Sequence, residues 1–381
     1  DGSVQSNPIA LAASNSHSLN MNKSWNMTMS AYVNLQPIKG LNIKSQFGYR
    51  KGDNAYRNMQ IKNNIGANPV SKDQVSQNMG VWSNISWNNT ASYAFEIDNH
   101  SIDVVLGQAI EKTTYGSNIN ATASNLLFGE SWDHAWLSNT EKLDISDVSV
   151  SGGPSADWSL ASFFGRASWN YNEKYMAQFT LRADGSSKFG PNNLWGFFPA
   201  AAAAWRISDE AFLEDANDWL SNLKLRLSYG MAGADNISSS LWRETWVSGT
   251  TKYNNVLVPT YGPEGLKANP DLKWETTISR NAGLDFGFWN NRLSGTLDFY
   301  WNTTKDLLMR QEIDSSTGYN YQYQNVGQTS NKGVEIALNG LAIDHKNFTW
   351  NLGLTLAHNK NKVLSLGNEE FVFPDADKQR G

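Results

Sequence analysis

Apolar and polar side chains alternate along most of this chain, and this period of two constrains the fold more than any other feature. In residues 348 to 358, Phe348, Trp350 and Leu352 occupy every second position, and polar Thr349 and Asn351 lie between them. Successive side chains of a β-strand point to opposite faces, so this pattern predicts strands with one apolar and one polar face. The same alternation occurs in residues 25–35, 41–49, 175–184, 223–229 and 284–302.

The connections between these segments are alternately short and long. Short turns have the sequences QPIKG, DNH, YNEK, WNNR and DHKN, and long polar connections cover residues 51–78, 112–158 and 232–273. Because short and long ends fall on opposite sides, the layout is typical of an outer-membrane barrel with tight periplasmic turns and long extracellular loops. In one longer periplasmic connection, SDEAFLEDANDWLSN, we expect a short helix with Ser208 as its N-cap.

Composition supports a membrane barrel. The chain has 16 Trp, 14 Tyr and 16 Phe residues although its mean hydropathy is -0.50. A transmembrane barrel places such rings in girdles at the two membrane interfaces and keeps its lumen polar. No run of about 18 apolar residues predicts a transmembrane helix. We therefore predict an all-β, transmembrane antiparallel β-barrel with roughly twelve strands in this chain.

Both ends of the sequence lack the features of a complete barrel. The chain opens with DGSVQSNPIA, where a signal segment would be charged and then apolar, and it ends with FVFPDADKQRG, which is typical of a loop. An unpaired strand edge in hydrocarbon is costly, so we expect the first strand, near Trp25, not to close onto the last, near Trp350. Residues 1–381 are therefore predicted to form part of one barrel domain whose remaining strands lie elsewhere.

Several classes of function are disfavoured by composition. The chain has no cysteine, so disulfides, thiolate metal sites and cysteine nucleophiles are excluded. Its five histidines, which have no metal-ligand spacing, are His17, His100, His134, His345 and His358. A net charge of -5 argues against nucleic acid as a partner. We expect no metal and no cofactor.

Four long segments from Leu181 onward have a distinctive sequence. They are LRADGSSKFGPNNLWGFFPAAAAAWRISDEAFL, WLSNLKLRLSYGMAGADNI, NPDLKWETTISRNAGLDFGFWNNRLSGTLDFYWNTTKDLLM and NVGQTSNKGVEIALNG. These segments resemble, in the same order, those of the SusC/RagA family of TonB-dependent transporters of Bacteroidota. The resemblance covers most of the chain and is weakest in the long loops.

The resemblance implies a barrel of about 22 strands with an internal plug, of which this chain supplies the middle and later part. It also implies multi-pass insertion in the outer membrane and import of a glycan, an oligopeptide or a similar large solute. In the family, TonB pulls on an N-terminal box to open the plug, and a SusD-like surface lipoprotein covers the extracellular mouth. The signal peptide, TonB box, plug and final strands are not recognisable here, so the resemblance assigns no energy-coupling residue.

Two groups of residues suggest chemistry only weakly. RADGSSKFG lacks the spacing and strand-to-helix context of a phosphate-binding loop, so we expect residues 184–186 to end a strand, with Gly185 at positive φ. Carboxylates that could be imagined as a glycosidase pair are Glu130, Asp133, Asp271 and Glu275. Nothing in the sequence brings two of them together, so we expect loop carboxylates and no enzyme activity.

Aromatic residues in the long connections are the candidate site. Flat rings stack on sugars or pack against peptide side chains, so these residues are candidates for contact with ligand or with the lid lipoprotein. The competing interpretation is that they hold the long loops together. The candidates are Trp132, Trp136, Trp242, Trp246, Tyr319, Tyr321 and Tyr323.

Two alternatives to active import remain open at this point. A passive porin has the same architecture, and a plug and TonB box in the complete protein would exclude it. A secreted all-β glycan-binding module or glycoside hydrolase also alternates and also exposes aromatics, but it would turn its apolar face inward and would need a convergent carboxylate pair.

Overall fold

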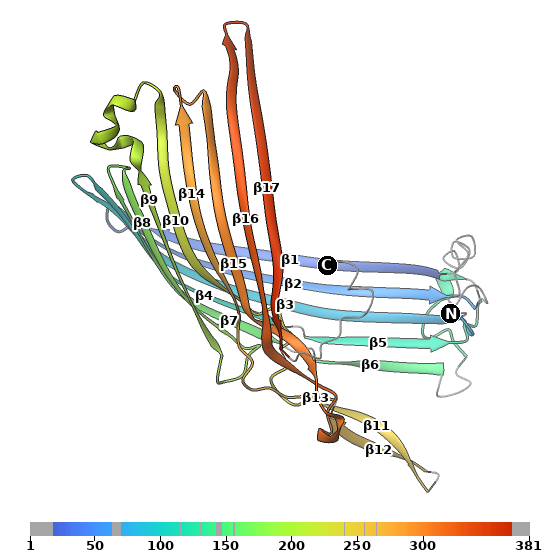
Figure 1. Ribbon diagram of the computed structural model, residues 1–381. Helices are drawn as coiled ribbons and strands as arrows, with labels where there is room; N and C mark the ends of the chain where they lie inside the picture. The colour runs from blue at the N-terminus through green and yellow to red at the C-terminus, as the bar shows by residue number, and fades with distance from the viewer. Residues whose placement is uncertain are drawn as a thin grey trace, which may run out of the picture. The chain divides into compact units, whose positions relative to one another are not determined.

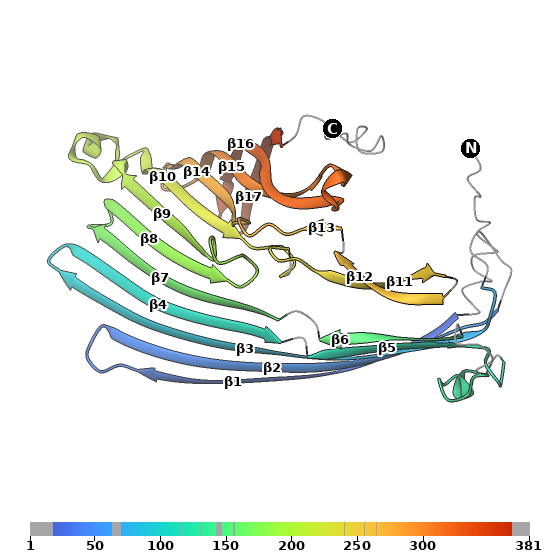
Figure 2. The same cartoon turned by 90° about the horizontal axis from the view of Figure 1, so that it is seen from below.

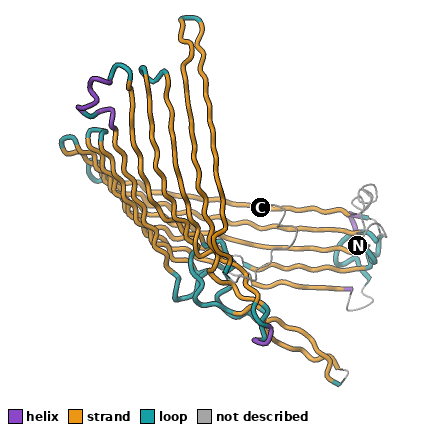
Figure 3. The backbone as a smooth tube through the Cα atoms, viewed as in Figure 1, coloured by secondary structure: helices purple, strands orange, loops and turns teal. Residues whose placement is uncertain are grey.

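The computed structural model consists almost entirely of β-strands (Figure 3). Among the described residues, no helix is both long and apolar enough to cross a membrane. The residues that the structure describes are 18–62, 70–114, 116–129, 131–141, 147–154, 157–239, 241–254, 256–263 and 265–367. The terminal segment FVFPDADKQRG lies outside them.

Seventeen strands are present in this described part of the chain, more than the twelve predicted. The additional strands arise mainly because long connections expected to be loops form hairpins. The strands are β1 (Ser18–Leu35), β2 (Leu41–Gln60), β3 (Gln74–Ile97), β4 (His100–Thr114), β5 (Ser117–Ser124), β6 (Val148–Pro154), β7 (Trp158–Tyr171), β8 (Tyr175–Ser186), β9 (Trp195–Arg206), β10 (Leu220–Ala234), β11 (Trp246–Tyr253), β12 (Val256–Pro263), β13 (Leu266–Lys267), β14 (Glu275–Phe288), β15 (Leu293–Glu312), β16 (Tyr321–His345) and β17 (Phe348–Leu366).

The chain divides into two compact units. The first takes the chain up to Ala31 together with Gln46–Trp87 and Glu111–Trp158, and the second takes Tyr32–Ser45, Asn88–Ile110 and the chain from Ser159 onward. In the first unit, β5 pairs antiparallel with β3 and with β6. In the second unit, β7, β8, β9, β10, β14, β15, β16 and β17 pair antiparallel in that order (Figures 1 and 2).

The first and last strands lie at ends of the hydrogen-bonded order. Within the described residues, β1 pairs with β2 and β17 pairs with β16, and no ladder joins β1 to β17. The expectation that the strand near Trp25 does not close onto the strand near Trp350 is therefore confirmed. Unpaired backbone groups are costly in hydrocarbon, so the coverage of these two edges by further strands stays a prediction.

The short turns join the strands where the sequence predicted them. Residues 36–40 join β1 to β2, residues 172–174 join β7 to β8, and residues 289–292 join β14 to β15. Positive φ angles occur at Asn172 (51°) and Glu173 (56°), as at the two central residues of a type I′ turn, and the Lys174 N–H closes this turn by donating to the Tyr171 carbonyl at 2.9 Å. The tight turns thus set the register of the strands that follow.

Register across the second unit assembles the apolar side chains into rows on one face. Residues directly opposite one another in antiparallel strands share a face, so the pairing of five strands places five aliphatic side chains side by side. This row is Leu225, Leu284, Leu297, Ile336 and Leu356. The neighbouring rows contain Leu223 with Phe286 and Leu354, and Leu227 with Phe299.

The opposite face of the same strands is polar. Arg226 of β10 donates hydrogen bonds through Nη2 to Asp285 (2.7 Å) on β14 and to Asp298 (3.1 Å) on β15. Lys224 shares this face because it lies an even number of positions from Arg226. The predicted separation of Leu223, Leu225 and Leu227 from Lys224 and Arg226 is confirmed.

Exposure identifies the face that meets lipid. Large apolar side chains of the aliphatic rows remain uncovered, including Leu227 (50% exposed), Phe299 (48%) and Leu356 (53%). Continuous apolar surface of this kind would be costly in water, and a barrel presents such a band outward to hydrocarbon. The face with Arg226 and its carboxylate partners therefore lines the lumen.

Two details of the local predictions are wrong. The expected helical segment after β9 is present as two short 3₁₀ helices, η3 (Ile207–Asp209) and η4 (Ala211–Ala216), but Ser208 lies inside η3 and is the N-cap of neither. Gly185 is extended within β8 and does not have positive φ. It is small for a packing reason, because a Cβ there would lie 3.0 Å from the ring of Trp195 on the neighbouring strand.

The face assignment predicts opposite outcomes for adjacent substitutions on β15. Leu297→Arg places a guanidinium near mid-membrane on the lipid face and should destabilise the full-length barrel by about 2 to 4 kcal/mol. Thr296→Arg, the matched control, points into the lumen beside Asp285 and should cost much less. Urea unfolding of each variant refolded in phospholipid vesicles measures the difference, and equal losses would contradict the assignment.

Candidate functional site

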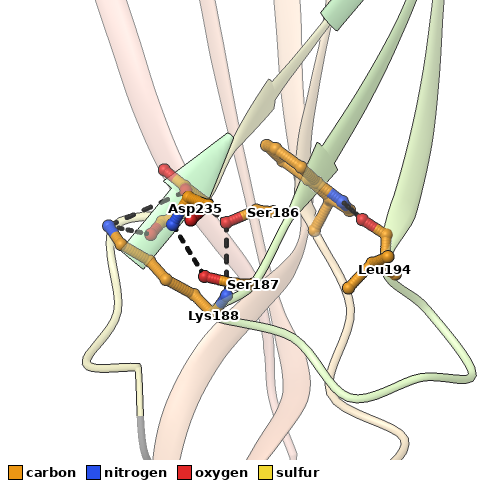
Figure 4. A network of polar contacts seen from close by, with 7 residues as sticks. Ser186, Ser187, Lys188, Leu194 and Asp235 are labelled. Carbon is orange, nitrogen blue, oxygen red and sulfur yellow. Dashed lines mark hydrogen bonds and ion pairs between the residues drawn. The ribbon is translucent and has the colours of Figure 1, made fainter. Parts of the chain in front are cut away.

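The signature segment after Leu181 builds a polar network in the second unit. The hydroxyl of Ser186, which is fully buried, donates to Asp235 Oδ2 at 2.8 Å (Figure 4). Lys188 Nζ donates to the backbone oxygen of Asp235 at 3.0 Å and lies 3.7 Å from its Oδ2. Ser186 and Lys188 thus tie the end of β8 to the connection that follows β10. RADGSSKFG is consequently a structural element, consistent with the rejection of a phosphate-binding role.

A buried apolar cluster adjoins this network. Phe189 (1% exposed), Phe198 (6%), Leu272 (0%) and Trp274 (8%) form its core. The rings of Phe189 and Trp274 are 5.1 Å apart, and the Trp274 indole N–H donates to the backbone oxygen of Leu194 at 3.2 Å (Figure 4). Two segments that the family resemblance singled out, residues 181–213 and the NPDLKW segment, therefore meet here and hold the long connections together.

Glycine is required next to this cluster for close packing. A Cβ at Gly233 of β10 would lie 2.0 Å from the ring of Phe198, and one at Gly196 of β9 would lie 2.5 Å from the same ring. Any side chain at these positions would expel the ring, because packed interiors have no free space for a methyl group. Sequence inspection alone did not identify Gly233 or Phe198 as important, since their contact joins different strands.

Two of the candidate aromatic residues belong to the first unit and clamp one arginine. The guanidinium of Arg57, on β2, lies 4.0 Å from the ring centre of Trp132 and 3.9 Å from that of Trp136. Arg57 is only 6% exposed and donates to the backbone oxygen of Ala135 at 3.3 Å. The cation–π sandwich anchors the connection between β5 and β6 onto β2. Both rings are therefore engaged within the chain, although Trp136 remains 41% exposed.

Trp242 and Tyr323 pack against the buried cluster of Phe189, Phe198, Leu272 and Trp274. Both are half-buried, so much of each ring serves to attach loops. The buried indole nitrogen of Trp242 has no hydrogen-bond partner among the described residues. A buried donor without an acceptor is costly, and an acceptor group supplied from outside the chain would satisfy it.

Tyr319 and Tyr321 are held by polar contacts between loops of the second unit. The Tyr319 hydroxyl donates to Glu244 Oε1 at 2.7 Å, and this bond to a carboxylate raises the pKa of Tyr319. The Arg310 guanidinium lies 3.9 Å from the ring centre of Tyr321. Tyr321 also meets the ring of Tyr323 edge to face, at 6.2 Å. The tyrosines thus form an ordered platform, which is a suitable support for stacking.

Trp246 is the most exposed of the candidates, at 62%. It begins β11, which among the described residues pairs with β12 alone, in a separate two-stranded sheet. This hairpin exposes further large apolar side chains: Val247, Tyr253, Val256 and Tyr261. A two-stranded hairpin is marginally stable by itself, so these exposed rings are available for contact with another surface.

The candidate carboxylates have ordinary structural partners. Asp271 accepts from Asn192 Nδ2 at 3.0 Å, and Glu275 accepts from the backbone N–H of Leu308 at 2.7 Å. Asp133 lies in the first unit, in the 3₁₀ helix η1 (Trp132–His134), and Glu130 lies outside the described residues. In the part of the chain that the structure describes, no group of three or more His, Asp or Glu side chains is arranged to hold a metal ion.

Comparison with known proteins identifies the family. Residues 3–375 match the family model described as TonB dependent receptor-like, beta-barrel. TonB-dependent receptor P26 of Formosa agariphila is 33% identical over an aligned length of 385 residues, which covers 100% of this chain and 38% of that protein. TonB-dependent receptor SusC of Bacteroides thetaiotaomicron is 33% identical over 301 residues, covering 77% of this chain and 28% of SusC.

A solved structure agrees with these relatives. The RagAB peptide importer in its closed-closed state superposes with a TM-score of 0.80 at 26% identity, covering 94% of this chain and 39% of that chain. The chain belongs to the family of TonB-dependent receptor β-barrels, whose members are receptors and transporters of the outer membrane. It resembles the SusC and RagA branch, and it spans less than two fifths of the length of these matched proteins.

The polar network predicts that Asp235 stabilises the loop end of the second unit. Asp235→Ala leaves the buried Ser186 hydroxyl without its acceptor and should cost about 1 to 3 kcal/mol. The control Asp218→Ala removes an exposed carboxylate and should change stability little. Limited proteolysis of residues 235–245 in the full-length protein reports the effect, and unchanged protection in the Asp235 variant would show that the network does not hold this loop.

Proposed function

We propose that the full-length protein imports a large nutrient solute, a glycan or an oligopeptide, through a plugged barrel energised by TonB and covered by a SusD-like lipoprotein. The observation that carries this proposal is the combination of a lipid-facing apolar band, a charged lumen face and the match to the TonB-dependent receptor barrel over residues 3–375. The family match favours active import over a passive porin and over a secreted enzyme or glycan-binding module.

One matched protein supports the proposed class of solute. RagAB, which matches this chain with a TM-score of 0.80, is a peptide importer. We infer an oligomeric solute because the rings of Tyr319 and Tyr321 lie beside polar groups, the carboxylate of Glu244 and the guanidinium of Arg310. Such a surface suits either sugar faces or peptide side chains, with hydrogen bonds supplied alongside the rings.

The exposed hairpin of β11 and β12 is the proposed contact with the lid. Its apolar side chains, led by Trp246, are the kind that anchor protein interfaces, and the loop end of the barrel is the extracellular end. The neighbouring ring of Trp242 is already engaged in the buried cluster, so it contributes mainly to loop stability. Trp246 and Trp242 therefore have different expected roles.

Uptake tests the transport proposal directly. Cells that depend on the full-length protein should accumulate a fluorescent oligopeptide or glycan library component only when TonB is present and the inner membrane is energised. Uptake that persists without TonB would indicate a passive pore. Absence of uptake for every solute, with the barrel correctly assembled, would contradict an import function.

The lid proposal makes a separate prediction for Trp246. Trp246→Ala should lower the amount of co-purified lipoprotein roughly tenfold or more, because central aromatic anchors dominate interface energy. Phe212→Ala, which removes an equally exposed ring from η4 at the end with short connections, is the control and should leave the complex intact. Quantitative mass spectrometry of the affinity-purified complex measures both. Equal recovery of the lipoprotein with the two variants would show that Trp246 is not part of the interface.

A further inference from the structure

A row of cations crosses the lipid face of the second unit beyond the aliphatic rows. The register places Tyr229 of β10 opposite Arg280, Arg280 opposite Trp301, Trp301 opposite Lys332, and Lys332 opposite Lys360 of β17. Directly opposed residues share a face, so two aromatic and three basic side chains form one row across five neighbouring strands. With strands about 4.8 Å apart, Arg280 and Lys332 are roughly 10 Å from one another.

The row lies on the lipid face and toward the end with long loops. Arg280 lies an even number of positions from Leu284 on β14, as Lys332 does from Ile336 on β16, so both share the face of the aliphatic row. The short turn that ends β14 lies on the far side of Leu284, at residues 289–292. The cations therefore border the apolar band at its extracellular edge, where Tyr229 and Trp301 form part of the aromatic girdle.

Negative charge is placed on the other face of these strands. Asp285 and Asp298 contact Arg226 on the lumen face, and Glu335 lies opposite Asp298 on that face. Among ion pairs between described residues, none includes Arg280, Lys332 or Lys360. A cationic row at a membrane edge without carboxylate partners attracts anionic headgroups, because basic side chains near a membrane surface interact favourably with anionic lipid.

Arg280 is held in position for such an anion. Its guanidinium lies 5.9 Å from the ring centre of Tyr229 and 5.8 Å from that of Trp301, and Nη1 is 3.5 Å from Thr303 Oγ1. Flanking rings restrict the side chain while leaving donors of the guanidinium open. A fork of N–H donors of this kind matches the oxygen atoms of a phosphate group.

A shallow apolar hollow of about 430 Å³ lies beside Arg280. Its lining includes the alanine run of β9 at Ala201 and Ala203 together with Leu227, Tyr229 and Trp301. Most of the lining is apolar, so the hollow suits a hydrocarbon chain. A cation suited to a phosphate group, Arg280, and a hollow suited to a hydrocarbon chain are thus adjacent on one surface.

We propose that this surface binds a phosphorylated glycolipid of the outer leaflet, with its phosphate groups on Arg280, Lys332 and Lys360 and an acyl chain in the hollow over Ala201 and Ala203. The assignment goes beyond solute import and depends only on the lipid-facing orientation of these strands. Phosphates spaced along one headgroup match cations spread over several strands, and the bound lipid would stabilise the barrel at its extracellular rim.

The test uses the full-length protein purified in detergent and a triple variant, Arg280→Gln with Lys332→Gln and Lys360→Gln. Native mass spectrometry should show roughly tenfold less bound lipid A in this variant, since each removed cation weakens attraction to anionic headgroups. A control that loses the same charge at the short turns, Lys39→Gln with Arg292→Gln and Lys346→Gln, should retain lipid A. The charge-preserving variant Arg280→Lys with Lys332→Arg and Lys360→Arg should also retain most of it.

Reconstitution into vesicles distinguishes lipid A from inorganic phosphate as the source of the bound phosphate group. In phosphatidylcholine vesicles, added lipid A should raise the melting temperature of the wild-type protein and not of the glutamine variant, whereas inorganic phosphate should raise neither. The proposal is overturned if the glutamine variant keeps its lipid A, if inorganic phosphate stabilises equally, or if the variant changes only the oligomeric state. Heat-modifiable migration on gels verifies folding, and because lipid binding is measured without uptake, its outcome is independent of the import proposal.

Discussion

Backbone hydrogen bonding in a medium without water is the constraint on which this structure depends. Every N–H and C=O group at membrane depth must find a partner within the protein, and an antiparallel ladder satisfies them strand by strand. The unbroken pairing from β7 to β17 supplies these partners across the second unit. The same constraint is the reason to expect further strands beside β1 and β17, which are not paired with each other in the described residues.

Once the ladder is present, successive side chains of each strand point alternately to lipid and to the lumen. Leucine rows collect on the lipid face, and charged groups such as Arg226 with Asp285 collect on the lumen face. The long connections are then free to carry function, but only where they are anchored. Anchoring comes from the Ser186–Asp235 bond, from the cluster around Phe198 and, in the first unit, from the Arg57 sandwich between tryptophans.

Anchoring also separates the candidate residues into groups with different roles. Rings of Trp132, Trp136, Trp242 and Tyr323 are largely committed to contacts within the chain, which supports the interpretation that they hold loops together. Trp246 has no such commitment and is exposed on a hairpin. Contact of these residues with ligand or lid stays a prediction, and the hairpin is the part of the loop end best suited to it.

The sequence by itself determined the strand class, the short turns and the face of each side chain, because these depend on neighbours within a strand and on the fixed period of two. It did not predict the hairpins inside the long connections, the caps of the two 3₁₀ helices at residues 207–216 or the extended Gly185, since pairing and packing partners decide these. Only the tertiary structure decided which residues meet across strands. The contact of Gly233 with Phe198 and the row from Arg280 to Lys360 depend on register between distant segments, which no local pattern encodes.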